Sequence, residues 1–147
     1  MTAEAVRDED PALAVTSFGP GTDEPALAVT SFGPASDADA VLAIHGITAN
    51  GRCWDTVAAL LAERRILAPD LRGRARSNAL PGPYGLRRHA ADLAALLEAD
   101  GGGGRTVIGH SMGAFVAVAL AGARPDLVAR LVLVDGGFPL ALPPGAT

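Results

Sequence analysis

The sequence predicts an α/β fold built on a doubly wound, mostly parallel sheet. Two observations carry this prediction. Short apolar runs of strand length recur along the chain without polar alternation, which is typical of strands buried on both faces. Segments with helical periodicity separate these runs, so strands and helices alternate from Ala40 to Val134. This order favours right-handed crossovers within one sheet.

The composition limits the classes to which the chain can belong. Its 147 residues are enough to bury a core, and its net charge of −4 comes without any basic cluster that would favour nucleic-acid binding. The longest apolar run is too short to span a bilayer. The acidic first residues lack a signal-peptide pattern, and a single cysteine fits a reducing compartment. We therefore expect a soluble cytoplasmic protein with neither a membrane nor a nucleic-acid partner.

The amino-terminal part contains a perfect internal repeat. Segment Pro11–Pro20 recurs unchanged as Pro25–Pro34. Each copy predicts a short strand bounded by proline and Gly-Pro turn signals, and two copies are too few for a solenoid. We interpret residues 11–34 as a duplicated strand segment, either a β-hairpin or one paired strand with a redundant copy. Residues 1–10 are expected to be a disordered N-terminus.

The first central strand, Ala40–Ile44, ends in a His45-Gly46-Ile47 turn. This turn exposes backbone N–H groups at the carboxyl end of the strand, where α/β sheets hold their ligands. A loop and a helix are expected over residues 51–65. The apolar face of that helix comprises Trp54, Val57, Ala58, Leu60 and Leu61. Trp54 either lines a pocket or packs the helix start against the sheet.

A second strand, Ile66–Ala68, runs into an arginine-rich loop. Asp70 and Arg72 in this loop are interpreted as architectural residues that hold neighbouring backbone by charge-assisted hydrogen bonds. An amphipathic helix is expected from Tyr84 to Asp100, with His89 exposed or half-exposed on it. The glycines that follow lack the Lys-Ser or Lys-Thr of a phosphate-binding loop.

The third strand, Thr106–Ile108, leads into Gly109-His-Ser-Met-Gly113 and a small-residue helix from Met112 to Arg124. A G-x-S-x-G pattern between a strand and a helix predicts a nucleophile elbow, in which a tight turn lifts Ser111 clear of the sheet. The alternative is a glycine-rich turn with a bystander serine. The glycines on either side would let the strand and helix backbones approach each other.

The last apolar strand, Leu131–Val134, ends at Asp135-Gly-Gly. Residues 35–137 are thus expected to form the α/β core, and residues 138–147 an irregular tail. If the sheet ends at this strand, Leu131–Val134 is a bare apolar edge through which copies of the chain would self-associate.

Four markers together resemble the amino-terminal half of an α/β-hydrolase, of the esterase-like branch with a His-Gly oxyanion loop. They are His45-Gly46-Ile47, Asp70-Leu-Arg-Gly73, Gly109–Gly113 and Leu131–Asp135, and the resemblance covers roughly residues 26–137. One departure is Ala75, where the family often has glycine. The resemblance implies that Ser111 attacks an ester or similar acyl carbonyl of a small molecule. It further implies that the N–H groups of Ile47 and Met112 hold the oxyanion, and that no metal or organic cofactor takes part. The expected binding residues are His45, Gly46, Trp54 and His110.

The catalytic triad of this family runs serine, acid, histidine along the chain. No histidine follows Ser111 in this sequence, and none of His45, His89 and His110 is expected to accept its proton. Asp135 ends the last strand, a position that some relatives use for the acid, and it could instead shape the pocket floor. The resemblance thus implies a truncated hydrolase. Three hypotheses remain open: a serine hydrolase completed by a longer parent chain or a partner, a catalytically inactive ligand-binding remnant, or a perhydrolase or carbon–carbon bond hydrolase.

Overall fold

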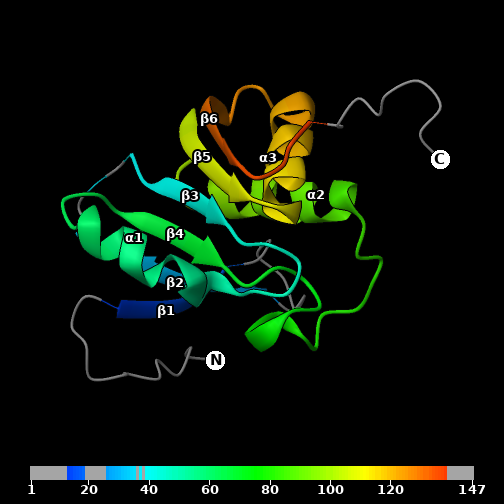
Figure 1. Cartoon of the computed structure of the whole chain (residues 1–147), viewed down its shortest axis with the longest axis horizontal. Helices are drawn as coiled ribbons and strands as arrows, with labels where there is room; N and C mark the ends of the chain where they lie inside the picture. The colour runs from blue at the N-terminus through cyan, green and yellow to red at the C-terminus, as the bar shows by residue number, and fades with distance from the viewer. Residues whose placement is uncertain (1–12, 19–25, 36, 38, 139–147) are drawn as a thin grey trace.

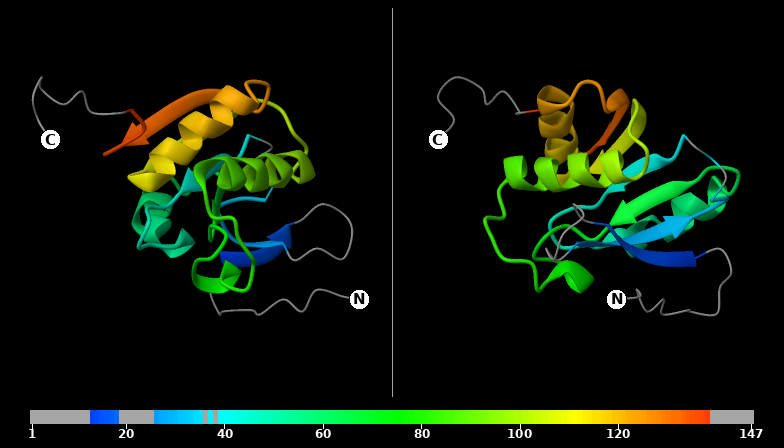
Figure 2. Two further views of the ribbon diagram at one scale, coloured as in Figure 1. Left: turned by 90° about the vertical axis from the view of Figure 1, so that its right-hand side faces the viewer. Right: turned by 180° about the vertical axis from the view of Figure 1, so that it is seen from behind.

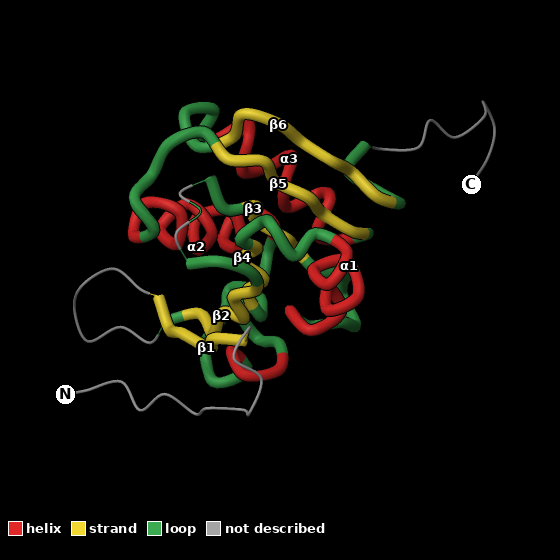
Figure 3. The backbone as a smooth tube through the Cα atoms, turned by 90° about the vertical axis from the view of Figure 1, so that its left-hand side faces the viewer, coloured by secondary structure: helices red, strands yellow, loops and turns green. Residues whose placement is uncertain are grey.

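One six-stranded sheet organises the residues that this computed structural model describes, which are 13–18, 26–35, 37 and 39–138 (Figure 1). The strand order is β1-β2-β4-β3-β5-β6, and Figure 3 shows it from one edge to the other. The strands are β1 Leu13–Phe18, β2 Leu27–Phe32, β3 Val41–Ile44, β4 Ile66–Pro69, β5 Arg105–His110 and β6 Val128–Val134. Strands β3 to β6 are parallel, whereas β1 and β2 run antiparallel to their neighbours. The prediction of a mostly parallel α/β sheet is confirmed.

Helices cover both faces of the sheet. Helix α1 (Asp55–Leu60) lies on one face, and helices α2 (Leu86–Ala99) and α3 (Met112–Ala123) lie on the other (Figure 3). Helices α2 and α3 also contact each other, as Figure 2 shows. Two short 3-10 turns, Gly51–Trp54 and Ala75–Ser77, complete the elements. The arrangement is doubly wound, as the alternation of strands and helices predicts.

Alternate residues of the central strands enter two separate cores. In β3, Leu42 and Ile44 point towards the α2–α3 side, whereas Ala43 joins the cluster under α1. Strand β4 alternates in the same way, with Leu67 on the first side and Ile66 on the second. Because successive side chains of a strand point to opposite faces, both faces of the central strands are buried. This explains their unbroken apolar sequences.

Both copies of the repeat form strands, and they pair with each other as an antiparallel hairpin. The second copy, β2, is the inner strand and pairs with β4. The backbone of Ala28 fixes this position, because its carbonyl accepts from Asp70 N at 2.8 Å and its N–H donates to Ser77 Oγ at 3.0 Å. The predicted N-terminus at residues 1–10 and all but Phe138 of the predicted tail lie outside the described residues.

Two predicted boundaries were wrong. Strand β6 begins at Val128 rather than Leu131, because Val128 and Arg130 already pair with the start of β5 across a bulge. Helix α1 ends at Leu60 rather than near Arg65, and Leu60 is 81% exposed instead of facing the core. Leu61, the last residue of the predicted apolar face, adopts non-helical backbone and is 44% exposed, so it does not share a helix face with the others.

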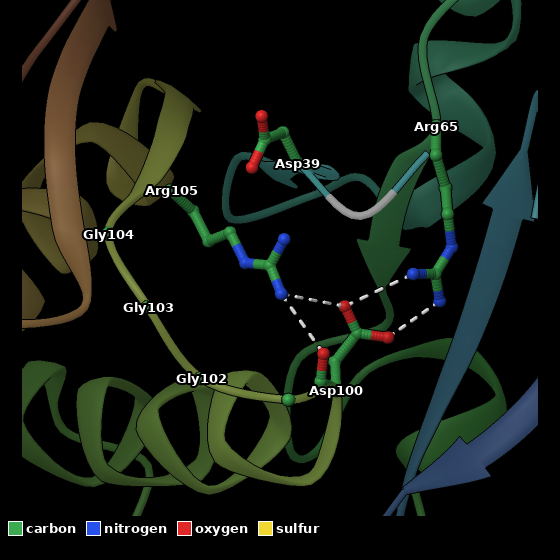
Figure 4. Close-up of a pocket in the computed structure, with 8 residues that line it drawn as sticks. Asp39, Arg65, Asp100, Gly102, Gly103, Gly104 and Arg105 are labelled. Carbon is green, nitrogen blue, oxygen red and sulfur yellow. Dashed lines mark hydrogen bonds and ion pairs between the residues drawn. The ribbon is translucent and has the colours of Figure 1, made fainter. Parts of the chain in front are cut away.

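The amino end of the sheet is tied together by Asp100, the residue that follows α2 (Figure 4). Its carboxylate accepts from Arg65 Nη2 at 2.6 Å and from Arg65 Nη1 at 3.2 Å, and its backbone carbonyl accepts from Arg105 Nη2 at 3.0 Å. Arg65 precedes β4 and Arg105 opens β5. One residue therefore joins the end of a helix to the starts of two strands.

The two edges of the sheet are formed by β6 and by β1. At the β6 edge, Leu131, Val132 and Val134 are 38%, 43% and 42% exposed, so the apolar edge expected from the sequence is present. The β1 edge consists of the first copy of the repeat. Within the described part of the chain, no helix is both long and apolar enough to cross a membrane.

Candidate active site

Ser111 occupies the turn between β5 and α3 in a backbone conformation that L-residues rarely adopt. Its φ is 53° and its ψ is −120°, a combination that costs on the order of 1–3 kcal/mol. Two hydrogen bonds hold it there: Ser111 N donates to Val134 O at 2.8 Å, and Ala114 N donates to Ser111 O at 3.0 Å. The serine therefore has the position and the strained backbone that the G-x-S-x-G motif predicts.

Glycines make this turn sterically possible. A Cβ on Gly109 would lie 2.6 Å from the carbonyl carbon of Gly113, so the strand and the helix could not approach as they do. A Cβ on Gly113 would lie 2.6 Å from His45 O and would also collide with Ile44 O. The first turn of α3 is thus pressed directly against the end of β3. This contact brings the His45-Gly46 loop to the elbow.

Gly46 lies beside the serine. A Cβ added at Gly46 would be 3.4 Å from Ser111 Cβ and 3.2 Å from His110 Nδ1. Gly46 O accepts from Ala49 N at 3.2 Å, which closes a turn around Ile47, whose side chain is 55% exposed. Met112 is the first residue of α3, where backbone N–H groups have no partner within the helix. The loop holding Ile47 and the helix start holding Met112 therefore flank Ser111.

His45 is a support for this loop and has no exposed surface with which to bind a substrate. Its Nε2 accepts from Leu71 N at 3.0 Å, so the proton resides on Nδ1, which donates to Gly46 O at 2.7 Å. Burial lowers the pKa of His45, since the charged ring would be poorly solvated. The expected binding role of His45 is therefore corrected to a positioning role.

Asp70 and Arg72 hold the loop beneath the site, as the sequence predicts. Asp70 accepts from Gly51 N at 2.8 Å and from Arg76 Nε at 2.7 Å. Burial alone would raise the pKa of Asp70, but the hydrogen bonds from Arg76 and Gly51 outweigh it and lower the pKa. Arg72 donates to both oxygens of Asp92 on α2, at 2.7 and 2.9 Å, and to Pro81 O at 2.9 Å.

The other expected binding residues fall in different places. Trp54 is buried against Ala43, Ala58 and Ile66 under α1, which supports its packing role over a pocket-lining one. His110, the last residue of β5, is exposed, and its ring lies beside Gly46. Of the four residues, Gly46 and His110 are at the elbow.

Asp135 stands close to the serine at the end of β6. It is exposed and has a φ of 52°. Its neighbour Val134 accepts the Ser111 N–H, and a Cβ on its other neighbour, Gly136, would lie 2.6 Å from Ser111 O. Sequence reasoning missed the role of Gly136, although the Gly-Gly pair after the strand was a signal for a close backbone approach.

His89 is not exposed, contrary to the expectation from the sequence. It is 1% exposed on the inner side of α2, and its Nδ1 has no hydrogen-bond partner in the described part of the chain. Burial lowers the pKa of His89. No hydrogen bond from a described residue reaches the Ser111 hydroxyl. The site therefore holds a strained serine and two flanking backbone segments without a histidine bonded to the serine.

Comparisons with known proteins agree on the fold. The family model for the alpha/beta hydrolase fold matches residues 39–146. Lipase LipV of Mycobacterium tuberculosis is 50% identical over 95 residues, which are 65% of this chain and 36% of that protein. Esterase Rv0045c of the same species is 39% identical over 99 residues, or 67% of this chain and 33% of that protein. The crystal structure of Cfl2 from Burkholderia cenocepacia superposes with a TM-score of 0.80 at 32% identity, covering 98% of this chain and 51% of that one. The chain thus spans about a third of the length of these two relatives and half of that structure.

Proposed function

The chain belongs to the α/β-hydrolase family, and on that premise we propose that it carries the nucleophile and oxyanion hole of a serine ester hydrolase. The observation that carries this proposal is the strained backbone of Ser111, held between glycines whose Cβ atoms would collide with backbone. Backbone strain persists only where the surrounding structure imposes it, and it clusters at functional sites. The relatives named lipase and esterase support an acyl ester as the substrate class.

In the proposed reaction, Ser111 Oγ attacks the ester carbonyl, the ester C–O bond breaks, and the alcohol leaves with the proton that the serine gives up. Water then cleaves the acyl-enzyme, which releases the carboxylic acid and restores the Ser111 hydroxyl. The N–H groups of Ile47 and Met112 stabilise the negative charge that develops on the carbonyl oxygen. Losing one such donor typically raises the barrier by about 2.7–4 kcal/mol. Gly46 lies close to Ser111, so the substrate carbonyl would be held between the loop that contains Gly46 and the start of α3.

Neither His45 nor His89 is placed to serve as the general base, and no hydrogen bond joins the third histidine, His110, to Ser111 among the described residues. His45 uses both ring nitrogens in hydrogen bonds, and His89 is buried in α2. Asp135 could act as the acid only together with a histidine from outside this chain. Removing the base from a serine enzyme can cost on the order of a million-fold in turnover. We therefore expect this chain alone to acylate slowly and to hydrolyse ordinary esters barely above background.

A fluorophosphonate probe tests the proposal, because it phosphonylates an activated serine without needing turnover. We expect slow labelling of the native chain that disappears in Ser111→Ala and persists in Cys53→Ser, a change at the exposed thiol. Labelling that survives Ser111→Ala would show that the reactive group lies elsewhere.

The second candidate is a ligand-binding module that performs no chemistry. The absence of a described hydrogen bond to the Ser111 hydroxyl favours it, since a nucleophile and its base are expected within hydrogen-bond reach. No labelling of a folded chain would favour the binding module. Formation of a peracid from an ester and hydrogen peroxide would instead indicate a perhydrolase, and cleavage of a carbon–carbon bond substrate without ester hydrolysis would indicate a carbon–carbon bond hydrolase.

A further inference from the structure

The two copies of the repeat pair with each other in a defined register. Strands β1 and β2 have the same sequence, Leu-Ala-Val-Thr-Ser-Phe, and run antiparallel with Leu13 opposite Phe32 and Val15 opposite Thr30. Within the described residues, β1 is an edge strand whose one strand neighbour is β2. The structure therefore already contains this hexapeptide bound to a second copy of itself.

The hydrogen bonds of β2 show which edge each residue uses. Ala28 O accepts from Asp70 N, so Ala28 points its backbone groups towards β4. Val29 lies opposite Pro69, which has no N–H to donate, and must point the other way. Because backbone groups alternate along a strand, three residues of β2 face β1. They are Leu27, Val29 and Ser31.

The same alternation identifies the β1 residues whose backbone groups point away from β2. The β1 residues opposite the three that face it are Phe18, Thr16 and Ala14, and these point their backbone groups towards β2. The backbone groups of the remaining residues, Leu13, Val15 and Ser17, point away from β2. Strand β1 thus presents at the edge of the sheet the same three positions of the hexapeptide that β2 presents to β1.

We propose that a second copy of this chain docks on this edge through its own β1, antiparallel and related by a two-fold axis that passes between the two Val15 residues. In this register Leu13 lies opposite Ser17 of the second copy, Val15 opposite Val15, and Ser17 opposite Leu13. All three outward-pointing residues of each strand then form hydrogen-bonded pairs. Any other antiparallel register leaves some of them unpaired.

The sequence of β1 lacks two of the devices that protect edge strands, namely charge and proline. It has no charged residue and no proline between Leu13 and Phe18. The paired strands would therefore bring no like charges together. A two-fold axis also limits the assembly to a dimer at this edge, because the β1 edges of both copies are paired in the contact.

The β6 edge is the competing site of self-association, since Leu131, Val132 and Val134 are exposed there. Strand β6 carries a charge, Arg130, whereas β1 carries none. The structure also shows no pairing of the β6 sequence with a copy of itself among the described strands. The β1 edge is therefore the better supported of the two.

Disulfide cross-linking tests the register. With the exposed thiol removed by Cys53→Ser, the variant Val15→Cys places two thiols at a hydrogen-bonded pair, whose Cα atoms are about 5.5 Å apart. This spacing is within the range of a disulfide. Thr16→Cys is the matched control, because Thr16 would lie opposite Ala14 of the second copy. With oxidised glutathione as the oxidant, we expect covalent dimers at least about tenfold faster for Val15→Cys. Equal rates for the two variants, or no dimer in either, would overturn the proposed register.

Sedimentation of the native chain at micromolar concentrations tests the dimer itself. Val15→Pro removes an outward N–H while leaving the β1–β2 ladder intact. The loss of two net hydrogen bonds across the axis should weaken the dimer about 10- to 100-fold. Leu131→Arg should leave the dimer unchanged. A dimer abolished by Leu131→Arg and kept by Val15→Pro would assign self-association to β6, and a strictly monomeric native chain would also refute the proposal.

Discussion

At the carboxyl end of the sheet two non-glycine residues, Ser111 and Asp135, have left-handed backbone, whereas the turn from α2 to β5 at the amino end reaches positive φ through glycines alone. Ser111 and Asp135 have φ angles of 53° and 52°, and close backbone packing keeps them there. Gly101 to Gly103 also have positive φ, but glycine adopts this conformation without strain. Asp100 and two arginines hold that end instead. The comparison shows that strain is kept at the end where the chemistry is expected.

Gly113→Ala, at the carboxyl end, should cause the largest loss of stability. The added Cβ would meet the carbonyl oxygens of Ile44 and His45, which are backbone atoms that cannot move aside. We expect a loss above about 4 kcal/mol in the free energy of unfolding, measured by urea titration. Gly122→Ala, on the same helix with nothing within 4 Å, is the control and should stabilise by up to about 1 kcal/mol. Similar losses in both variants would mean that general helix effects, and not the contact with β3, dominate.

Asp100→Asn, at the amino end, should cause a smaller loss of stability. Asp100 and Arg105 are each 6% exposed, so the change leaves a buried guanidinium without its carboxylate. We expect a loss of about 3 kcal/mol in the free energy of unfolding. The exposed pair between Arg52 and Asp55 provides the comparison, and Asp55→Asn should cost less than about 1 kcal/mol. If the two variants were equally stable, the buried cluster would add nothing beyond an ordinary surface pair.

Both ends show what the sequence could and could not predict. The strained turn at Ser111 was predictable, because G-x-S-x-G between a strand and a helix is a local pattern whose glycines and serine specify their own backbone. The role of Asp70 was predictable for a similar reason, since a charged residue directly after a buried strand must find partners. The Asp100 cluster was not, because it joins residues that are far apart in the chain. The burial of His89 was missed because the apolar pattern of α2 does not show which elements pack against the side of the helix that carries His89.

The buried histidines behind the carboxyl end should make the fold sensitive to mild acid. The pKa values of His45 and His89 are lowered in the folded chain from 6.5, mainly by burial. Their contribution to stability is therefore complete above pH 6.5 and is lost as the pH falls below it. The free energy of unfolding should decline as the pH falls below 6.5, by at most about 1.4 kcal/mol per pH unit for each histidine. His89→Leu should reduce this slope, and an unchanged slope would assign it to other groups.

Ser111→Gly is the smallest change and the sharpest test of where the strain lies. Glycine adopts a φ of 53° without the clash of a Cβ, so the variant should gain about 1 kcal/mol in the free energy of unfolding while losing all labelling by a fluorophosphonate. The reverse change at the amino end, Gly102→Ala, forces a residue with a Cβ to a φ of 66° in open space and should lose about 1 kcal/mol. Opposite signs for the two variants would confirm that one end stores strain and the other avoids it. A loss of stability in Ser111→Gly would instead mean that the hydroxyl contributes contacts worth more than the strain, and that the elbow is held for packing.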